Sequence, residues 1–173
     1  MLLADAAIDV LGRDGLRALT HRAVDARAGL PQGTCSYHHR TRRSLLAAAL
    51  NRIAELDRAD MAAGAAACGG TLESAVAVLG RWLGPGRVRT RARLVLMLDA
   101  EARRDLGDEA GRLANGFVTG ATATVGDAAR ARLLVALLDG LVADDLIRGG
   151  DGAPPPDELR ERVAAVLGLV APR

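Results

Sequence analysis

The chain has 173 residues, half of them hydrophobic and a quarter charged, which is the balance of a folded globular protein and excludes a disordered one. Only Tyr37, Trp82 and Phe117 are aromatic, so alanine, leucine and valine must fill the core, and this favours helices over strands. The formal net charge of +2 excludes a polyanion-binding surface over the whole molecule, but the charge is unevenly distributed.

Hydrophobic residues recur at helical spacing through most of the chain, which predicts an all-α fold of about nine helices. Thr20, Thr41 and Asp127 are suited to cap helix starts, and Gly29 is suited to end a helix. Pro31 fits the first turn of a helix, because its missing N–H would be unpaired there. The expected helices cover about 3–11, 20–28, 31–39, 41–62, 71–83, 87–104, 108–125, 127–148 and 157–170.

Basic residues are concentrated near the N-terminus. Between Arg13 and Arg52 there are eight arginines and two aspartates, and all three histidines lie in the same segment. The rest of the chain is therefore net acidic, and we predict a polyanionic partner for the N-terminal segment alone. A solvated arginine face is the simpler alternative for the same charges.

Two short helices joined by a glycine-containing turn lie within this basic segment, as in a helix-turn-helix. In that motif the second helix enters the major groove of DNA, and its first residues meet the base edges. Glutamine pairs with adenine and threonine contacts thymine, so these positions have the appropriate chemistry. An ordinary αα-hairpin is the alternative. The base-proximal candidates are Gln32, Gly33, Thr34 and Ser36.

Residues 16–46, LRALTHRAVDARAGLPQGTCSYHHRTRRSLL, resemble the signature of the TetR family of transcriptional regulators. The matching features are a threonine before a short helix, Ala28-Gly29-Leu30 at the turn, Gly33-Thr34 and Tyr37-His38 in the recognition helix, and Thr41-Arg42 with Leu45-Leu46. The resemblance is strongest over residues 1–46. It implies an N-terminal DNA-binding domain, here 1–45, and an effector-binding and dimerisation domain, here 46–173, bridged by a helix from about 42 to 62.

By the same resemblance, phosphate contacts are expected from Thr20, Tyr37, His38 and Arg42, and base contacts from the four residues above. The full expected DNA-binding set is Thr20, His21, Arg22, Gln32, Gly33, Thr34, Ser36, Tyr37, His38, Arg42 and Arg43. The sequence departs from the family pattern at His39, where phenylalanine is usual, and at Cys35, where leucine is common. Both changes predict a less tightly packed DNA-binding domain, and the chain begins without the basic arm that often precedes the first helix.

The segment around Leu133–Leu138 is apolar on nearly every side, so a helix there must be covered on every side. We expect a homodimer in which this helix and the last helix form a four-helix interface with their symmetry mates. A central helix buried within a monomer is the alternative. The expected interface residues are Leu134, Leu137, Leu138, Leu141, Leu159, Val163, Val166 and Leu167.

A ligand pocket is expected among bulky adaptable side chains, namely Met61, Trp82, Met97 and Phe117, with Asp99, Glu101 or Asn115 as polar groups. The sequence shows no catalytic or metal-binding motif, and we predict neither enzyme activity, cofactor nor metal. The two cysteines do not imply a disulfide scaffold. There is no signal peptide pattern and no apolar run of ~20 residues, so we predict a cytoplasmic protein without a membrane segment.

The sequence therefore predicts a transcriptional regulator, a repressor released from a palindromic operator by a small-molecule effector. Two alternatives remain. One is a redox-responsive regulator acting through Cys35, and the other is a regulator-like scaffold that has lost specific operator binding.

Overall fold

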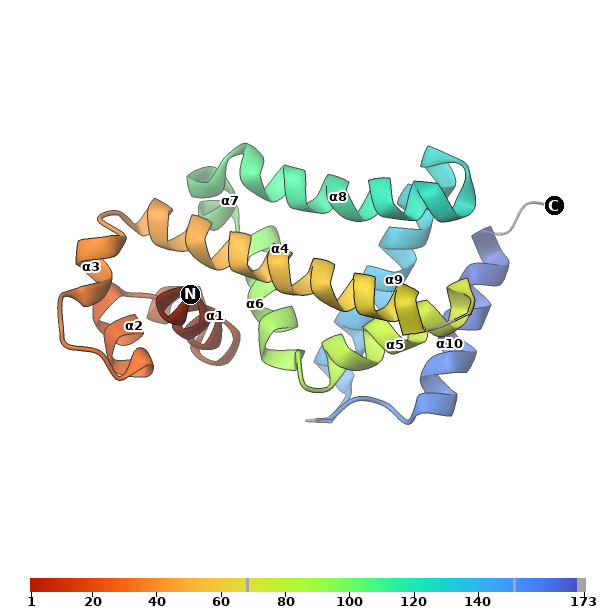
Figure 1. Cartoon of the computed structure of the whole chain (residues 1–173), viewed down its shortest axis with the longest axis horizontal. Coiled ribbons are helices and arrows are strands. Elements are labelled where there is room, and N and C mark those ends of the chain that lie inside the picture. Colours follow the sequence, from red (N-terminus) through yellow and green to blue (C-terminus); the bar gives the residue numbers. More distant parts are fainter. Residues whose placement is uncertain (68, 151, 171–173) are drawn as a thin grey trace. The chain divides into compact units, whose positions relative to one another are not determined.

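A computed structural model describes residues 1–67, 69–150 and 152–170. These residues form an all-α fold without strands (Figure 1). The elements are α1 (Leu2–Asp14), the 3₁₀ turn η1 (Leu16–Ala18), α2 (His21–Ala28), α3 (Thr34–His38), α4 (Arg42–Ala67), α5 (Thr71–Leu83), α6 (Arg87–Leu98), α7 (Ala100–Leu106), α8 (Asp108–Val125), α9 (Ala128–Arg148) and α10 (Pro156–Val170). The predicted all-α class is confirmed.

Several predicted boundaries are wrong. The helices expected over 3–11 and 41–62 extend further, to Asp14 and Ala67. The helix expected over 87–104 is divided, because the Asp99 side chain accepts hydrogen bonds from the amides of Glu101 and Ala102 and so starts α7. The helix expected from Pro31 begins only at Thr34, and Pro31 lies in the preceding turn. The predicted caps are confirmed: Thr20 accepts from Ala23 N–H, Asp127 accepts from Arg130 N–H, and Thr41 accepts from Ser44 N–H.

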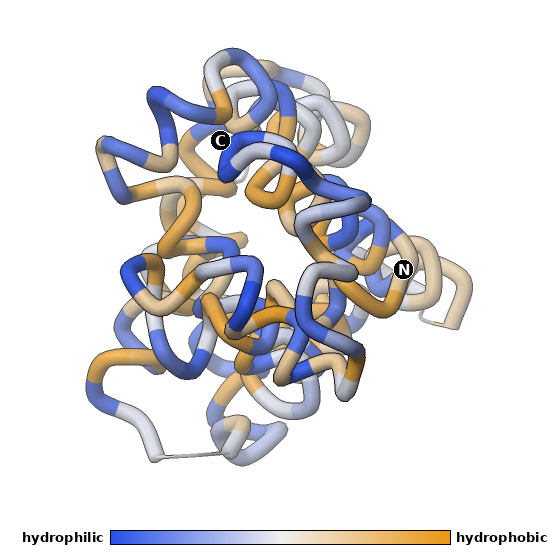
Figure 2. Tube along the Cα trace, turned by 90° about the vertical axis from the view of Figure 1, so that its left-hand side faces the viewer, coloured by the Kyte–Doolittle hydropathy of each residue, from blue (hydrophilic) through white to orange (hydrophobic). Residues whose placement is uncertain are grey.

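The helices are amphipathic, and this is why they pack. In Figure 2 hydrophobic and hydrophilic stretches alternate along the trace of most helices. In α5, for example, Val78, Leu79, Trp82 and Leu83 are buried, whereas Glu73 is exposed. Spacing of three and four residues places such side chains on one face, so each helix buries one stripe against its neighbours.

The chain divides into two compact units. Unit 1 comprises Met1–Asp57 and Val88–Gly111, and unit 2 comprises Arg58–Arg87 and the residues from Arg112 on. The predicted division after residue 45 differs from this one, because the first half of α4 and the whole of α7 belong to unit 1. Helices α4 and α8 each continue from one unit into the other.

Unit 1 is built on α1, which packs against α2, and on the close approach of α6. A Cβ on Gly12 would lie only 2.1 Å from the carbonyl oxygen of Val88, so α1 and α6 approach this closely because residue 12 has no side chain. Asp57 near the middle of α4 is buried, and its carboxylate pairs with Arg93 at 2.7 Å and Arg89 at 3.0 Å from α6. A buried charge needs such partners, since burial without them is costly.

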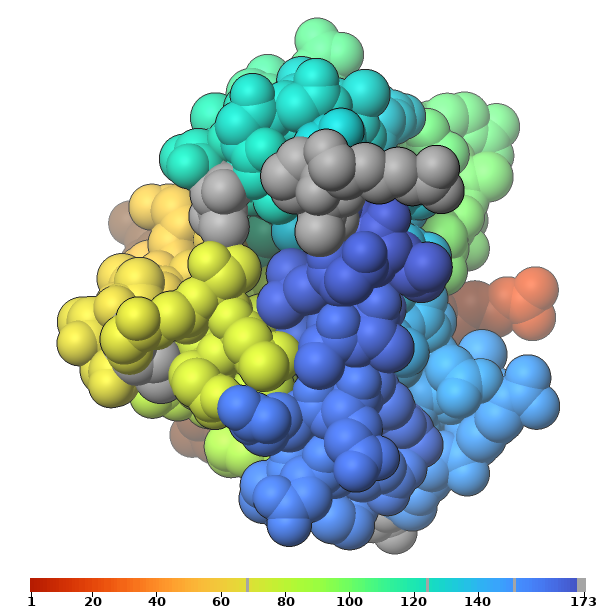
Figure 3. Space-filling view, turned by 90° about the vertical axis from the view of Figure 1, so that its right-hand side faces the viewer, coloured from red at the N-terminus to blue at the C-terminus, as the bar shows by residue number. Residues whose placement is uncertain are grey.

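Unit 2 is held by aliphatic packing of α5, α9 and α10. Figure 3 shows α5 (yellow) beside α10 (deep blue). One buried cluster joins these three helices and contains Leu79, Leu83, Val142, Leu159 and Val163. A second cluster joins α9 and α10 and contains Leu134, Val166 and Val170. A buried ion pair adds a polar anchor, because Arg87 donates to the Asp145 carboxylate (2.7 Å) and to its backbone carbonyl (3.0 Å).

Candidate DNA interface and ligand cavity

The turn between α2 and α3 is held by one buried carboxylate. Asp25 is 2% exposed, and its Oδ2 accepts from Gly33 N–H (2.8 Å) while its Oδ1 accepts from Cys35 N–H (2.7 Å). Gly33 has φ +99°, a conformation that side chains disfavour, and it provides the reversal that starts α3. Because α3 has only five residues, too few to be stable alone, Asp25 fixes its position.

The residues expected at base edges lie at the start of α3. Gln32, Gly33 and Ser36 are exposed and Thr34 is partly exposed, so all four are accessible to a ligand of unit 1. The Thr34 hydroxyl donates to the Pro31 carbonyl (2.7 Å), and the Ser36 hydroxyl donates to the Gly33 carbonyl (2.9 Å). Their base contacts remain a prediction.

Two of the residues expected at phosphates, Tyr37 and His38, lie on α3 itself. Tyr37 is 76% exposed, and its ring meets that of His38 edge to face at 5.1 Å. Thr20, also expected at a phosphate, is exposed. Among the other residues of the expected DNA-binding set, Arg22 and Arg43 are exposed, whereas His21 is partly buried and its Nε2 lies 2.5 Å from the His39 carbonyl oxygen. These contacts also remain predictions.

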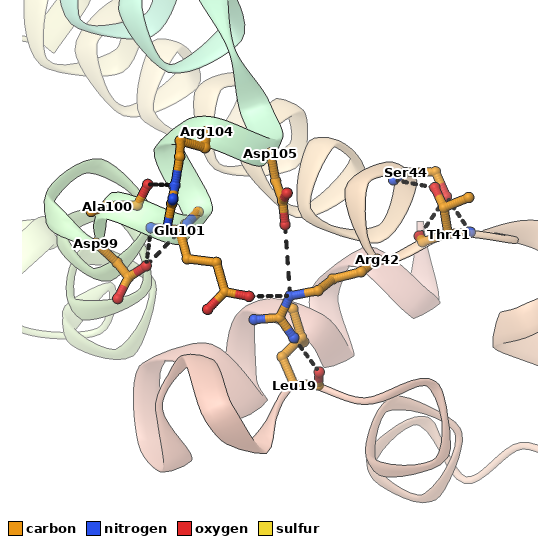
Figure 4. Close-up of polar contacts among 10 residues, drawn as sticks. Leu19, Thr41, Arg42, Ser44, Asp99, Ala100, Glu101, Arg104 and Asp105 are labelled. Atoms are coloured by element: carbon orange, nitrogen blue, oxygen red, sulfur yellow. Dashed lines mark hydrogen bonds and ion pairs between the residues drawn. The ribbon is translucent and has the colours of Figure 1, made fainter.

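Arg42, at the start of α4, has protein partners that the sequence did not reveal (Figure 4). Its Nη1 donates to the Leu19 carbonyl (3.3 Å), and its Nε lies 3.9 Å from Glu101 and 3.8 Å from Asp105, both on α7. These carboxylates are at ion-pair distance but beyond hydrogen-bond distance, and all three side chains are at least one-third exposed. A phosphate at Arg42 would therefore compete with weakly held partners.

His39 takes the place where the resemblance predicts an apolar ring. It is partly buried, and burial together with the nearby charges of His38, His21 and the N-terminus lowers its pKa below the usual value. Protonation of His39 is thus opposed by the fold; the weaker packing expected at this position stays a prediction.

Cys35 is fully buried in unit 1, and burial together with the Asp25 charge raises the pKa of its thiol. A buried thiol with a raised pKa carries little thiolate, the form that reacts with oxidants. The redox alternative therefore loses its chemical basis at Cys35; Cys68 lies outside the described residues.

Unit 2 contains a cavity of about 540 Å³, within the size range of small-molecule sites. Its walls are mostly apolar, and Trp82 and Phe117 meet edge to face at 5.7 Å on one side. Asp139 of α9 is the one ionisable residue among those that line it. The lining residues are Met61, Ala65, Gly69, Gly70, Thr71, Ser74, Ala75, Val78, Leu79, Trp82, Phe117, Gly120, Ala121, Leu134, Val135, Leu138, Asp139, Val142 and Leu167.

Three of the four expected pocket residues, Met61, Trp82 and Phe117, line this cavity. Met97 does not; it lies on α6 in unit 1. The expected polar groups are also elsewhere, since Asp99 caps α7 and Glu101 faces Arg42. Asp139 was missed, although an acidic residue inside the apolar run from Leu133 to Val142 was a signal for it.

The expected dimer residues fall into two groups. Leu134, Leu159, Val163 and Val166 are at most 7% exposed within the subunit, so they have little surface to offer a partner, and their place in an interface stays a prediction. These residues face the core of their own subunit. The helical spacing predicts that this face is buried, but it does not show whether the same subunit or a partner covers it. The other four, Leu137, Leu138, Leu141 and Leu167, are partly buried and remain candidates.

Within the described ranges, no helix is long and apolar enough to cross a membrane. The same residues hold no group of three or more histidine, cysteine, aspartate or glutamate side chains placed to bind a metal ion.

A helix-turn-helix in one unit and an apolar cavity in the other are the features of a helix-turn-helix transcriptional regulator. Residues 69–169 match the family model described as "Tetracyclin repressor-like, C-terminal domain". The chain is 34% identical to the multidrug binding protein EbrR complexed with imidazole, covering 99% of this chain and 94% of that chain (TM-score 0.74). It is 32% identical to a TetR family member from Streptomyces coelicolor A3, with 99% and 97% covered (TM-score 0.75).

EbrR complexed with ethidium is also similar, with 30% identity, 95% and 96% covered and a TM-score of 0.68. No protein of curated function matches the sequence. The family-model match spans more than half of the chain, and the identities extend over nearly all of it. The chain belongs to the TetR family of transcriptional regulators.

Proposed function

We propose that this regulator is a dimeric repressor that binds a palindromic operator and dissociates from it when an aromatic organic cation binds in unit 2. The observation that carries the effector class is Asp139, a carboxylate on the wall of a mostly apolar cavity with an aromatic pair. A carboxylate in an apolar site stabilises a cation, and aromatic rings attract cations through their faces. The similarity to EbrR, solved with ethidium, supports the same ligand class.

Operator binding is tested by selecting sites from random duplex DNA and measuring the affinity of the best site against salt concentration. We expect a palindrome whose half-sites are about 34–36 Å apart, because a two-fold dimer presents its recognition helices to successive major grooves. Affinity should fall steeply with salt, since phosphate binding releases counterions. Enrichment of no sequence would overturn the operator proposal.

The cation proposal is tested with ethidium as the probe, by fluorescence titration of the protein. We expect Asp139→Asn to weaken ethidium binding about tenfold while binding of a neutral aromatic of similar size changes little. Asp144→Asn is the matched control, because Asp144 is an exposed aspartate on the same helix that does not line the cavity. Equal ethidium affinity in the wild type and Asp139→Asn would contradict the proposal.

Release of the protein from its operator requires more than binding of the cation in the cavity. A ligand shifts the equilibrium only if it favours the conformation that does not bind DNA, because equal affinity for both conformations changes nothing. Saturating ethidium should therefore lower operator affinity more in the wild type than in Asp139→Asn, because intercalation of ethidium into the DNA itself affects both proteins equally. Tight ethidium binding with unchanged operator affinity would show that a ligand in the cavity does not regulate DNA binding.

For the dimer we propose the exposed face of α9 and α10 in place of the buried stripe. Leu133, Ile147 and Leu169 are 49%, 79% and 72% exposed, and they give these helices apolar surface that a partner subunit would cover. Small exposed residues, Gly140, Ala164, Ala165 and Gly168, lie on the same helices and permit close packing. Light scattering tests this: Ile147→Glu with Leu169→Glu should convert the dimer to a monomer, and an unchanged mass would refute this face.

A further inference from the structure

The hydroxyl groups of Thr34 and Ser36, at the start of α3, both donate hydrogen bonds within the protein. The Thr34 hydroxyl lies 2.7 Å from the Pro31 carbonyl oxygen, and the Ser36 hydroxyl lies 2.9 Å from the Gly33 carbonyl oxygen. A carbonyl oxygen carries no hydrogen, so the hydroxyl must be the donor in both pairs. What each hydroxyl retains is its lone pairs, which accept hydrogen bonds.

The backbone donors at the same place are also engaged. Gly33 N–H and Cys35 N–H bind the buried Asp25 carboxylate, and Thr34 N–H points to the Pro31 carbonyl at 3.2 Å. The amides of residues 33 to 35 therefore have partners inside the protein. Asp25 in particular satisfies two of the donors that a helix start otherwise leaves open.

We infer that Thr34 and Ser36 read DNA as hydrogen-bond acceptors, and so recognise exocyclic amino groups in the major groove. The only such groups there are adenine N6 and cytosine N4; guanine offers O6 and N7, and thymine offers O4, all of which are acceptors. A hydroxyl that keeps its internal bond favours adenine or cytosine at the base it faces. Gln32 differs, because its exposed amide offers both a donor and an acceptor.

This inference rests on the proposed operator binding and adds the chemistry of the bases read. Ser36 is exposed and Thr34 partly so, and both lie on the helix that the motif places in the groove. The side-chain bonds to the backbone also hold each hydroxyl in one direction, which lowers the entropy lost on binding.

The experiment uses the operator selected by the full chain and base analogues that lack only the amino group. Purine replaces each adenine and pyrimidin-2-one replaces each cytosine, one position at a time, and affinity is measured by fluorescence anisotropy. We expect at least one position in each half-site where the wild type loses about tenfold in affinity. At that position the Thr34→Val or the Ser36→Ala variant should bind the operator with and without the amino group almost equally well, because the hydroxyl that accepts from the amino group is gone.

The control is Thr119→Val, at an exposed position of α8. It removes a hydroxyl that makes the same kind of bond, donating to the Asn115 carbonyl at 3.0 Å. It should show the wild-type loss at every position. Thr34→Val and Ser36→Ala alter different side chains, one partly exposed and one exposed, so each tests the proposal if the other does not fold.

Three results would overturn the inference. One is a wild type that tolerates removal of every adenine and cytosine amino group. A second is that Thr34→Val and Ser36→Ala both retain the full wild-type loss. A third is that these variants instead lose sensitivity to 7-deazaguanine, which lacks the N7 acceptor and would reveal a donating hydroxyl. Failure of the proposed function is distinguishable, because it appears earlier, as a wild type that selects no operator.

Discussion

Unit 1 and unit 2 both have a buried apolar core, and unit 1 in addition fixes two of its short helices with polar bonds. In unit 1 the short helices α2 and α3 are fixed by polar bonds directed at single backbone atoms, from Thr20 to Ala23 N–H and from Asp25 to Gly33 and Cys35 N–H. In unit 2 the longer helices α5, α9 and α10 pack through aliphatic side chains and enclose a cavity of about 540 Å³. Hydrogen bonds are directional, whereas apolar contacts are not.

The difference suits the two parts to different tasks. A surface that must match a fixed spacing of chemical groups needs a fixed geometry, and unit 1 has the bonds to maintain one. A cavity that admits ligands of differing shape needs walls that shift at low cost, and methyl and methylene groups provide them. The predictions below test this contrast, from the largest expected effect to the smallest.

The same substitution, glycine to alanine in a helix, should have opposite effects in the two units. Gly12→Ala in unit 1 should lower the free energy of unfolding by about 3 kcal/mol, because the new Cβ would lie 2.1 Å from the Val88 carbonyl oxygen. Gly120→Ala in unit 2 should raise it by roughly 0.5–1 kcal/mol, because helix propensity improves and the nearest neighbour is the flexible Met61 methyl at 3.5 Å. Urea unfolding measures both, and effects of the same sign would contradict the contrast.

Asp25→Ala should destabilise unit 1 by about 2 kcal/mol, since it leaves the amides of Gly33 and Cys35 without their acceptor. Amide hydrogen exchange at these two positions should accelerate at the same time. Asp99→Ala is the matched control, because Asp99 also accepts from two amides but at a less buried helix start, where the loss is about 1 kcal/mol. Equal losses would show that burial at Asp25 adds nothing.

His39→Phe should stabilise unit 1 by about 1 kcal/mol by burying an apolar ring, and it should also reduce acid sensitivity. The folded pKa of His39 is lowered by burial and by His38 and His21, so the unfolded chain binds the proton more readily. Stability from this source is therefore present above the unfolded pKa of about 6.5 and is lost as the pH falls below it. Melting temperatures at pH 7.5 and 5.5 measure the change; an identical pH dependence in the variant would refute it.

Glu101→Gln with Asp105→Asn should strengthen operator binding about threefold at low salt, because Arg42 would no longer be shared with α7. The gain should shrink as salt screens the charges. In an Arg42→Ala background the double substitution should have no effect beyond a general change in charge. A gain that persists without Arg42 would show that the two carboxylates act by long-range repulsion alone.

Local signals in the sequence predicted much of the fold. The caps at Thr20, Thr41 and Asp127 and the end of α2 before Gly29 depend on residues within a few positions, and the structure confirms them. The start of α3 was placed too early because Pro31 also fits a turn. The division of α6 from α7 was missed because the sequence around Asp99 remains helical in composition on both sides.

Contacts between distant residues could not be predicted in this way. Arg42 meets Glu101 and Asp105 only because α7 folds back into unit 1, and no spacing rule connects these positions. Residue type alone identified Met61, Trp82 and Phe117 as cavity residues, yet the same reasoning included Met97, which belongs to unit 1. Bulk and flexibility suit a side chain to a cavity wall, but the direction in which its helix faces decides whether it is there.

The placement of Asp25 beneath the start of α3 has a consequence for how such a protein diversifies. The carboxylate that holds the helix is buried, whereas Gln32, Thr34 and Ser36 lie wholly or partly at the surface. Exposed residues can then be exchanged in evolution, or by an engineer, without remaking the scaffold that carries them. Under the operator binding proposed above, a duplicated copy of this gene would acquire a different target through changes at these exposed positions alone, with the buried carboxylate left in place.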